Sequence, residues 1–141
     1  MEVSLNILAI LVLTVCSFFA GSFWYGPLFG KLWMRMHYGD KPLSKEEMAK
    51  SMQGLWKIML TELASTFIMV MTLDFLIQIL PGFSGIHVAF LVWFGFVLPS
   101  MVSSIIWGKD DKGWMPAKIF ISTSYRLLFL LISAFVLQSW V

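Results

Sequence analysis

Long apolar stretches separated by short charged segments form the pattern of this chain. A transmembrane helix needs about twenty mainly apolar residues, because the hydrocarbon layer is about 30 Å thick and a helix rises about 1.5 Å per residue. Four stretches meet this requirement, at residues 5–25, 58–80, 86–107 and 119–140. The pattern therefore predicts an all-α integral membrane protein, with a bundle of four transmembrane helices forming a single membrane domain over residues 1–141.

The positive charges indicate an orientation for this bundle. Nine of the ten Lys and Arg residues lie in residues 31–57 or 109–118, and the tenth is Arg126. Short loops rich in Lys and Arg stay on the cytoplasmic side of a membrane. The link at residues 81–85 has no charge. We therefore expect both charged segments inside the cell, and this link and both termini outside.

The end of the first apolar stretch has the composition of a membrane boundary. Trp24 and Tyr25 have amphipathic rings of the kind that collect at the level of the lipid headgroups. Gly26 and Pro27 should break the helix there, where water can satisfy the freed backbone groups. This aromatic boundary is also a candidate surface for docking a partner.

The second helix is expected to begin before the membrane. Ser44 and Glu47 have the spacing of a capping box, in which the first and fourth residues of a helix start satisfy each other's backbone N–H groups. Apolar residues keep helical spacing from Met48 to Met59. The sequence therefore predicts one unbroken helix from about Lys45 through the second span, with its first turns in the cytoplasm.

Two charged residues within the apolar stretches need partners. Glu62 lies about 6 Å inside the cytoplasmic edge of the second span, and Arg126 lies about 12 Å inside that of the fourth. An arginine at that depth costs a few kcal/mol or more unless it is paired or reaches water. Because an arginine head can extend toward the interface, we expect Arg126 to pair with Glu62.

Three interpretations of this pair remain open. It is a structural link between the second and fourth spans, or a site for an anion, a proton or a coupled solute, or Arg126 extends past lipid to the interface without a partner. Thr66, one turn beyond Glu62, and Tyr125, next to Arg126, complete the candidate solute site. Charges at depth often mark transport pathways, which favours testing the second interpretation.

The third span has a proline and a faint echo of the first. Pro99 frees a backbone carbonyl one turn back, so a kink is expected there. Trp93-Phe94-Gly95 resembles Trp24-Tyr25-Gly26, and both lie on spans that run inward. Parallel repeats occur among transporters, although the two matches lie at different depths in their spans.

The composition excludes several functional classes. The chain is 59% hydrophobic and 13% charged, and its net charge of +2 is too small to indicate binding to nucleic acid. Cys16 is the single cysteine, and His37 and His87 are expected on opposite sides of the membrane, so they cannot share a metal. No nucleotide-binding or nucleophile motif is present. We therefore expect no enzyme activity, no cofactor and no metal site.

Three segments resemble the signatures of a known family. They read Trp-Tyr-Gly-Pro-Leu-Phe-Gly-Lys-Leu-Trp-Met at 24–34, Trp-Phe-Gly-Phe-Val-Leu-Pro at 93–99 and Lys-Ile-Phe-Ile-Ser-Thr-Ser-Tyr-Arg-Leu at 118–127. They are similar to the domain of unknown function 1761 family, small bacterial proteins with four predicted spans. The matching positions are Trp24, Tyr25, Gly26, Pro27, Gly30, Trp93, Gly95, Pro99 and Tyr125. The resemblance implies a four-span fold and a bacterial plasma membrane location, and it implies no activity or substrate.

Two hypotheses about function follow. In the first, the protein is a small homo-oligomeric permeation or transport unit for an ion or a small solute, and Glu62, Thr66, Tyr125 and Arg126 line a wet cavity. In the second, it is a non-transporting accessory or assembly protein whose aromatic boundary docks a partner. Both place the chain in a lipid bilayer, and neither involves nucleic acid.

Overall fold

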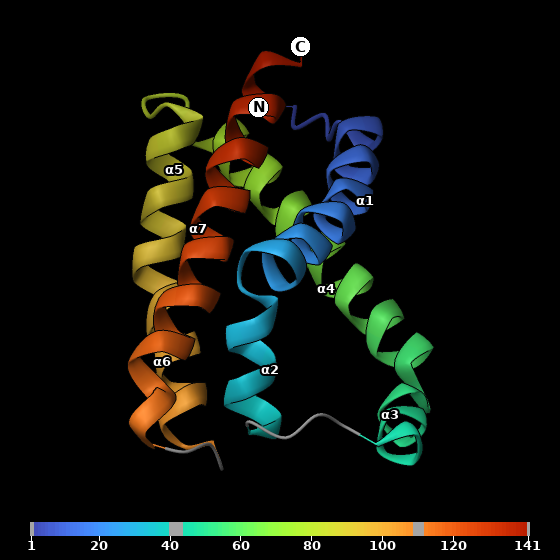
Figure 1. Ribbon diagram of the computed structural model, residues 1–141. Helices are drawn as coiled ribbons and strands as arrows, with labels where there is room; N and C mark the ends of the chain where they lie inside the picture. The colour runs from blue at the N-terminus through green and yellow to red at the C-terminus, as the bar shows by residue number, and fades with distance from the viewer. Residues whose placement is uncertain (1, 40–43, 109–111, 141) are drawn as a thin grey trace.

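Helices make up all the regular structure of the described chain. A computed structural model describes residues 2–39, 44–108 and 112–140 (Figure 1). Four helices in these ranges are long and apolar enough to cross a membrane: Ile7–Leu28, Leu55–Ile79, Gly85–Ile106 and Lys112–Ser139. The predicted all-α fold with four spans is therefore confirmed.

The first span changes its helical type near the predicted boundary. The α-helix α1 (Ile7–Phe23) begins at Asn6, whose side chain accepts a hydrogen bond from the Ala9 N–H. A π-helical segment, η1 (Trp24–Leu28), follows and contains Gly26 and Pro27. In a π-helix the N–H reaches five residues back, and Phe29 N donates to Trp24 O at 3.0 Å. The next helix, α2 (Gly30–Tyr38), starts after this wide turn.

The predicted unbroken second helix is wrong, although its start is right. Helix α3 (Lys45–Met52) begins at Ser44 with both hydrogen bonds of the capping box. It ends at Gln53, which is extended, and Gly54 has a φ of 72°. This left-handed conformation is open to glycine because glycine has no Cβ. Helix α4 (Leu55–Ile79) then starts anew, so the chain can turn before it enters the second span.

The third span is also interrupted, and the fourth is continuous. Helix α5 (Gly85–Val92) passes into a second π-helical segment, η2 (Trp93–Val97), and then into α6 (Leu98–Ile106). Pro99 lies in the first turn of α6, where its missing N–H is tolerated. The irregularity expected near this proline is the π-helical segment η2, which comes just before it. The short 3₁₀ turn η3 (Lys112–Trp114) leads into α7 (Met115–Ser139).

Helix α7 lies at the centre of the bundle. It packs against α1, α4, α5 and α6, and the tightest helix pairs are α5 with α7 and α1 with α4 (Figure 1). The two ends of the chain lie together at one end of the bundle, and α2, α3 and α6 reach the other (Figure 1). The core residues are apolar and come from α1, α4, α5 and α7: Ala9, Ile10, Leu13, Val70, Leu73, Val88, Ala89, Phe129, Leu130, Ala134 and Leu137.

The first half of α4 leaves the bundle. In Figure 1 it leads away from α2, α6 and α7 toward α3. Trp56 and Ile58 are 62% and 64% exposed, and no residue of α3 is buried. Because the side chains at residues 55–60 are mostly apolar and all exposed, this stretch must be covered by lipid or by another polypeptide.

Candidate functional site

The two charges within the spans form an ion pair. Arg126 Nη2 of α7 lies 2.7 Å from Glu62 Oε1 of α4, as predicted from the depths of the two residues. Arg126 is 23% exposed and Glu62 is 51% exposed. The pair is therefore located at an open edge between two helices and not in a sealed interior.

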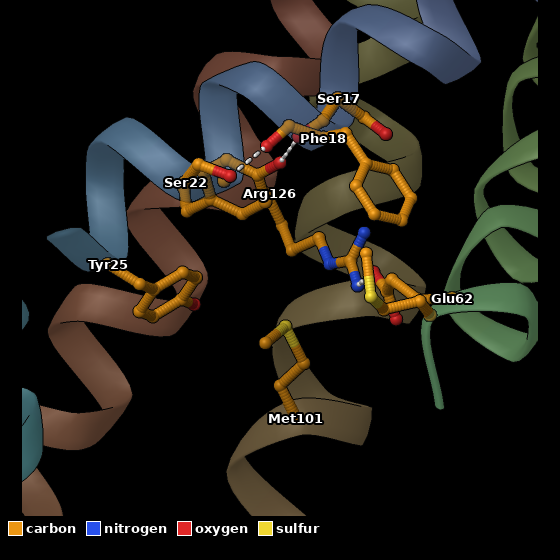
Figure 2. Close-up of a pocket in the computed structure, with 10 residues that line it drawn as sticks. Ser17, Phe18, Ser22, Tyr25, Glu62, Met101 and Arg126 are labelled. Atoms are coloured by element: carbon orange, nitrogen blue, oxygen red, sulfur yellow. Dashed lines mark hydrogen bonds and ion pairs between the residues drawn. The ribbon is translucent and has the colours of Figure 1, made fainter. Parts of the chain in front are cut away.

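A pocket of about 490 Å³ surrounds the pair (Figure 2). Figure 2 shows the Arg126 side chain crossing the pocket between Phe18 and Met101 toward Glu62. The wall combines two charges, hydroxyl groups, a glycine and apolar side chains, from Ser17, Phe18, Gly21, Ser22, Tyr25, Met59, Glu62, Met101, Tyr125 and Arg126. This volume and this mixture of few polar groups among apolar ones are typical of small-molecule sites.

Tyr125 connects the pocket to α1. Its hydroxyl donates a hydrogen bond to the carbonyl of Ser17 at 2.9 Å, and its ring lies 5.8 Å from the guanidinium carbon of Arg126. A Cβ at Gly21 would lie 3.3 Å from the Tyr125 hydroxyl oxygen. The small residue therefore lets α7 approach α1 closely, as is usual where helices pack in lipid. Tyr125 positions α1 and also forms part of the pocket wall.

The aromatic boundary docks on α7 next to this pocket. Trp24 Nε1 donates a hydrogen bond to the carbonyl of Ile121 at 3.0 Å. Tyr25 lines the pocket, and its ring centroid lies 4.7 Å from that of Trp33 and 5.7 Å from that of Tyr125. The motif residues 24 and 25 are thus involved in packing inside this chain.

The glycines and prolines of the motifs have different environments. Gly30 is buried, and a Cβ there would lie 2.8 Å from the Tyr25 carbonyl oxygen, so only glycine fits. Gly26 and Gly95 lie in the two π-helical segments, and a Cβ at either would meet nothing within 4 Å. Pro27 and Pro99 are both exposed.

Trp93 repeats the contact made by Trp24. Its Nε1 donates to the carbonyl of Thr123 at 2.9 Å, two residues along α7 from the acceptor of Trp24. Both tryptophans also begin a five-residue π-helical segment. The three-residue echo in the sequence therefore corresponds to a shared backbone conformation and a shared way of docking on α7.

Thr66 lies away from the solute site for which it was a candidate. It is 1% exposed, does not line the pocket, and its hydroxyl has no hydrogen-bond partner among the described residues. It lies on the same side of α4 as Glu62 but one turn deeper, where α4 packs against α1 and α7 and encloses it. The candidate site therefore contains Glu62, Tyr125 and Arg126 without Thr66.

Several lining residues were outside the candidate set. Ser17 and Gly21 are on the small-residue face of the first span, and this pattern was a usable signal for a close helix contact. Met59 and Met101 gave no signal beyond helical spacing, because a methionine in a span is common as a packing residue. Whether these two methionines line a pocket depends on the distance between α4 and α6, which the sequence pattern does not encode.

At the other end of the bundle, Asp74 is buried near the end of the second span. It is 4% exposed, and its Oδ2 accepts a hydrogen bond from the Asn6 N–H at 2.9 Å. A carboxylate at this position favours the start of α1, because a helix N-terminus has a partial positive charge. Asp74 therefore contributes to the way α1 begins.

The pocket around the Glu62–Arg126 pair, named the inner pocket from here on, contains polar groups suited to binding. Within residues 2–39, 44–108 and 112–140 no group of three or more His, Cys, Asp or Glu residues could hold a metal ion. The pocket offers one guanidinium, one carboxylate and hydroxyl groups. These groups can exchange hydrogen bonds and charge with a small polar molecule.

Comparison with known proteins gives a family and no relative of known activity. No curated protein and no solved structure matches the chain. The model of a family described as "Protein of unknown function (DUF1761)" matches residues 8–138, which cover the four spans except for Ile7 and Ser139. The chain is therefore a member of the DUF1761 family of proteins of unknown function.

Proposed function

We propose that this protein is a small permeation or transport unit that binds an ion or a small solute in the inner pocket. The observation that carries the proposal is an ion pair within the transmembrane helices that is open to a pocket of about 490 Å³. An exposed ion pair stabilises a fold by about 1 kcal/mol or less, so the pair with the half-exposed Glu62 adds little to stability. The two side chains can therefore separate, and each can form hydrogen bonds with a solute instead.

The guanidinium indicates the chemical group that the pocket would take. Among the described residues, Arg126 donates one hydrogen bond, from Nη2 to Glu62. A guanidinium has five N–H donors arranged as a fork, so most of them remain for a ligand. Carboxylates and phosphates match that fork through two parallel hydrogen bonds. We propose that the solute has an anionic group that binds Arg126.

The uncovered half of α4 supports an oligomer. Residues 55–60 are exposed and mostly apolar, and the pocket lies beside them through Met59 and Glu62. A second copy of the chain packed there would cover the stretch and close the pocket on that side. The same stretch favours a second candidate function, in which an accessory protein docks a different membrane partner. Native mass spectrometry from nanodiscs distinguishes the two, because it measures whether the extra mass equals one more chain.

We also propose that the chain acts without catalysis or a cofactor, in a bacterial plasma membrane with both termini outside. The absence of charge from residues 81–85, against nine basic residues in residues 31–57 and 109–118, supports this orientation. The inner pocket then lies toward the cytoplasm, because it is on the side of the spans where α2 and α6 end (Figure 1).

The proposed function is tested by flux through proteoliposomes. The vesicles are loaded with radiolabelled acetate, glycine or phosphate, and efflux is compared with that from protein-free vesicles. Arg126→Gln and Glu62→Gln remove the two charges, and Lys57→Gln removes an exposed charge outside the pocket lining. We expect flux of at least one probe, reduced about tenfold or more by the pocket variants, because charge-assisted hydrogen bonds are the strongest contacts available.

Lys57→Gln should transport at the wild-type rate, since it leaves the pocket intact. Equal reduction by all three variants would show that charge, and not the pocket, governs the flux. Efflux no faster than from protein-free vesicles for every probe would contradict the proposal.

A further inference from the structure

A second pocket lies at the opposite end of the bundle, near the two chain ends. It has a volume of about 720 Å³ and is formed by the N-terminal arm, the end of α4 and the end of α7. Asn6, Asp74, Gln78, Gln138 and Trp140 are among its lining residues, and none of them lines the inner pocket. The apolar core around Val70 and Leu130 lies between the two pockets. The outer pocket is therefore a separate candidate site.

Asp74 has an incomplete set of partners in this pocket. It is 96% buried, and among the described residues it receives one hydrogen bond, from Asn6 N–H to Oδ2. Its role at the start of α1 accounts for that bond and leaves Oδ1 without a donor. A carboxylate can accept about four hydrogen bonds, and Oδ1 is accessible, since the enclosed side-chain atoms without a partner in the described part of the chain are Thr66 Oγ1 and Ser133 Oγ. This free oxygen belongs to a residue that lines the pocket.

The neighbouring amide groups do not supply the missing donor. Gln78 Nε2 donates to the Ser4 carbonyl, and Asn6 Nδ2 donates to the Trp140 carbonyl. The Gln138 side-chain oxygen accepts from Gly85 N–H at 2.9 Å. These bonds fix the walls of the pocket, while each amide keeps at least one further N–H and each oxygen keeps a second lone pair. Among the lining residues Asp74 is the charged one, and its carboxylate can only accept hydrogen bonds.

The charges at this end of the bundle favour a cation. The sequence has no Lys or Arg in residues 1–30, 58–108 or 127–141. The side-chain charges near this end come from Glu2 and Asp74, and the ring of His87 is hydrogen-bonded to the Ser84 hydroxyl at 2.7 Å. A pocket lined by one sign of charge attracts the opposite ion. The volume suits a small organic molecule better than a bare metal ion.

We propose that the outer pocket binds a small organic cation with a primary ammonium group, which donates hydrogen bonds to Asp74 Oδ1 and to the amide and backbone oxygens around it. An ammonium group has three N–H donors and no acceptor, so it complements this wall. The inference does not depend on the inner pocket or on transport.

Thermal unfolding in nanodiscs tests the site, with ethylammonium chloride as the probe. A ligand that binds the folded state raises the melting temperature until the site is saturated. Tetramethylammonium has the same charge without an N–H, and sodium is a bare ion. Asp74→Asn keeps the size of the side chain and an oxygen for the Asn6 N–H. Glu62→Gln is the matched control, because it removes the carboxylate of the other pocket.

We expect a saturable rise with ethylammonium in the wild type and in Glu62→Gln, and binding about tenfold weaker or more in Asp74→Asn, because a charged partner is lost. An equal response of Asp74→Asn and wild type would overturn the proposal, as would an equal response to tetramethylammonium or sodium. If Asp74→Asn does not fold, the wild type is titrated with each of the three cations and its tryptophan fluorescence is followed. A saturable change with ethylammonium alone then shows that the site requires an N–H donor. No response to ethylammonium would also overturn it.

Discussion

Trp24 and Trp93 dock on the same helix in the same way. Each begins a π-helical segment of five residues, and each donates its indole N–H to a carbonyl of α7, at Ile121 and Thr123. Both segments occur where a span changes to a further helix, α2 or α6. π-Helical turns are rare and are often found at functional sites. Here they bring two indoles to α7 from nearly opposite sides, because acceptors two residues apart are about 200° apart around an α-helix.

The first prediction concerns these indole contacts. Trp24→Phe and Trp93→Phe should each lower the free energy of unfolding by about 1 kcal/mol or somewhat more, the net value of one hydrogen bond plus some lost packing. The cost stays small because each carbonyl of an α-helix also accepts from the residue four positions on. Unfolding by denaturant in detergent micelles measures it. Trp56→Phe is the matched control, since Trp56 is 62% exposed, and an equal loss there would contradict the prediction.

A second prediction separates two glycines of one motif. Gly30→Ala should destabilise the fold by about 1–3 kcal/mol, because its Cβ would lie 2.8 Å from the backbone oxygen of Tyr25 and the turn must shift. Gly26→Ala should be neutral or slightly stabilising, because a Cβ there meets nothing within 4 Å. Melting temperatures of the two variants in the same detergent make the comparison. A loss at Gly26 as large as that at Gly30 would show that the space around Gly30 is not the cause.

The third prediction concerns the energy of the Glu62–Arg126 pair. A double-mutant cycle with Glu62→Gln and Arg126→Gln should give a coupling energy of about 1 kcal/mol or less, because the exposure of both side chains weakens the attraction. The measurement is denaturant unfolding of the four proteins. A coupling of about 3 kcal/mol or more is the value for an enclosed pair, and it would contradict an open pocket at this position.

The fourth prediction concerns the start of α1. Asp74→Ala removes the acceptor of the Asn6 N–H and leaves that group unpaired, which should cost about 1–3 kcal/mol. Asp74→Asn should cost less, because its amide oxygen still accepts. Hydrogen exchange should accelerate in the first turn of α1 in Asp74→Ala, near Ile7, and stay unchanged in α6. Equal exchange in the two variants would rule out this role of the carboxylate.

The fifth prediction concerns orientation. In a Cys16→Ser background, Gly82→Cys lies in the uncharged link between α4 and α5, and Gln53→Cys lies between α3 and α4. Both positions are exposed, so both can react. A membrane-impermeant maleimide should label Gly82→Cys in intact cells, and it should label Gln53→Cys only after lysis, because basic loops stay inside. The reverse pattern would invert the proposed topology.

The four spans and the Glu62–Arg126 contact were predictable from the sequence. Both follow from the free energy of transferring side chains from water into hydrocarbon. An apolar stretch must cross the membrane, and two opposite charges placed at similar depth on helices that enter from the same side must find each other. Glu62 and Arg126 meet for that reason. The capping box at Ser44 was predictable because its two hydrogen bonds involve only local residues.

Other features depend on contacts that a linear pattern does not contain. The break at Gly54 was missed because one glycine inside a helical pattern is often tolerated, and the choice between helix and turn is made by what surrounds it. Thr66 lies one turn beyond Glu62, as the sequence shows, yet the close approach of α1 and α7 to α4 encloses it. The burial of Asp74 depends on the chain ends, which fold over the end of α4.

The central position of α7 has a consequence for biogenesis. The spans leave the ribosome in order, so α1, α4 and α5 enter the membrane before α7 is made. The acceptors for Trp24 and Trp93, and the cation for Glu62, all belong to α7. Until the last span is inserted, the nascent chain therefore exposes two unsatisfied indole groups and one unpaired carboxylate to the lipid.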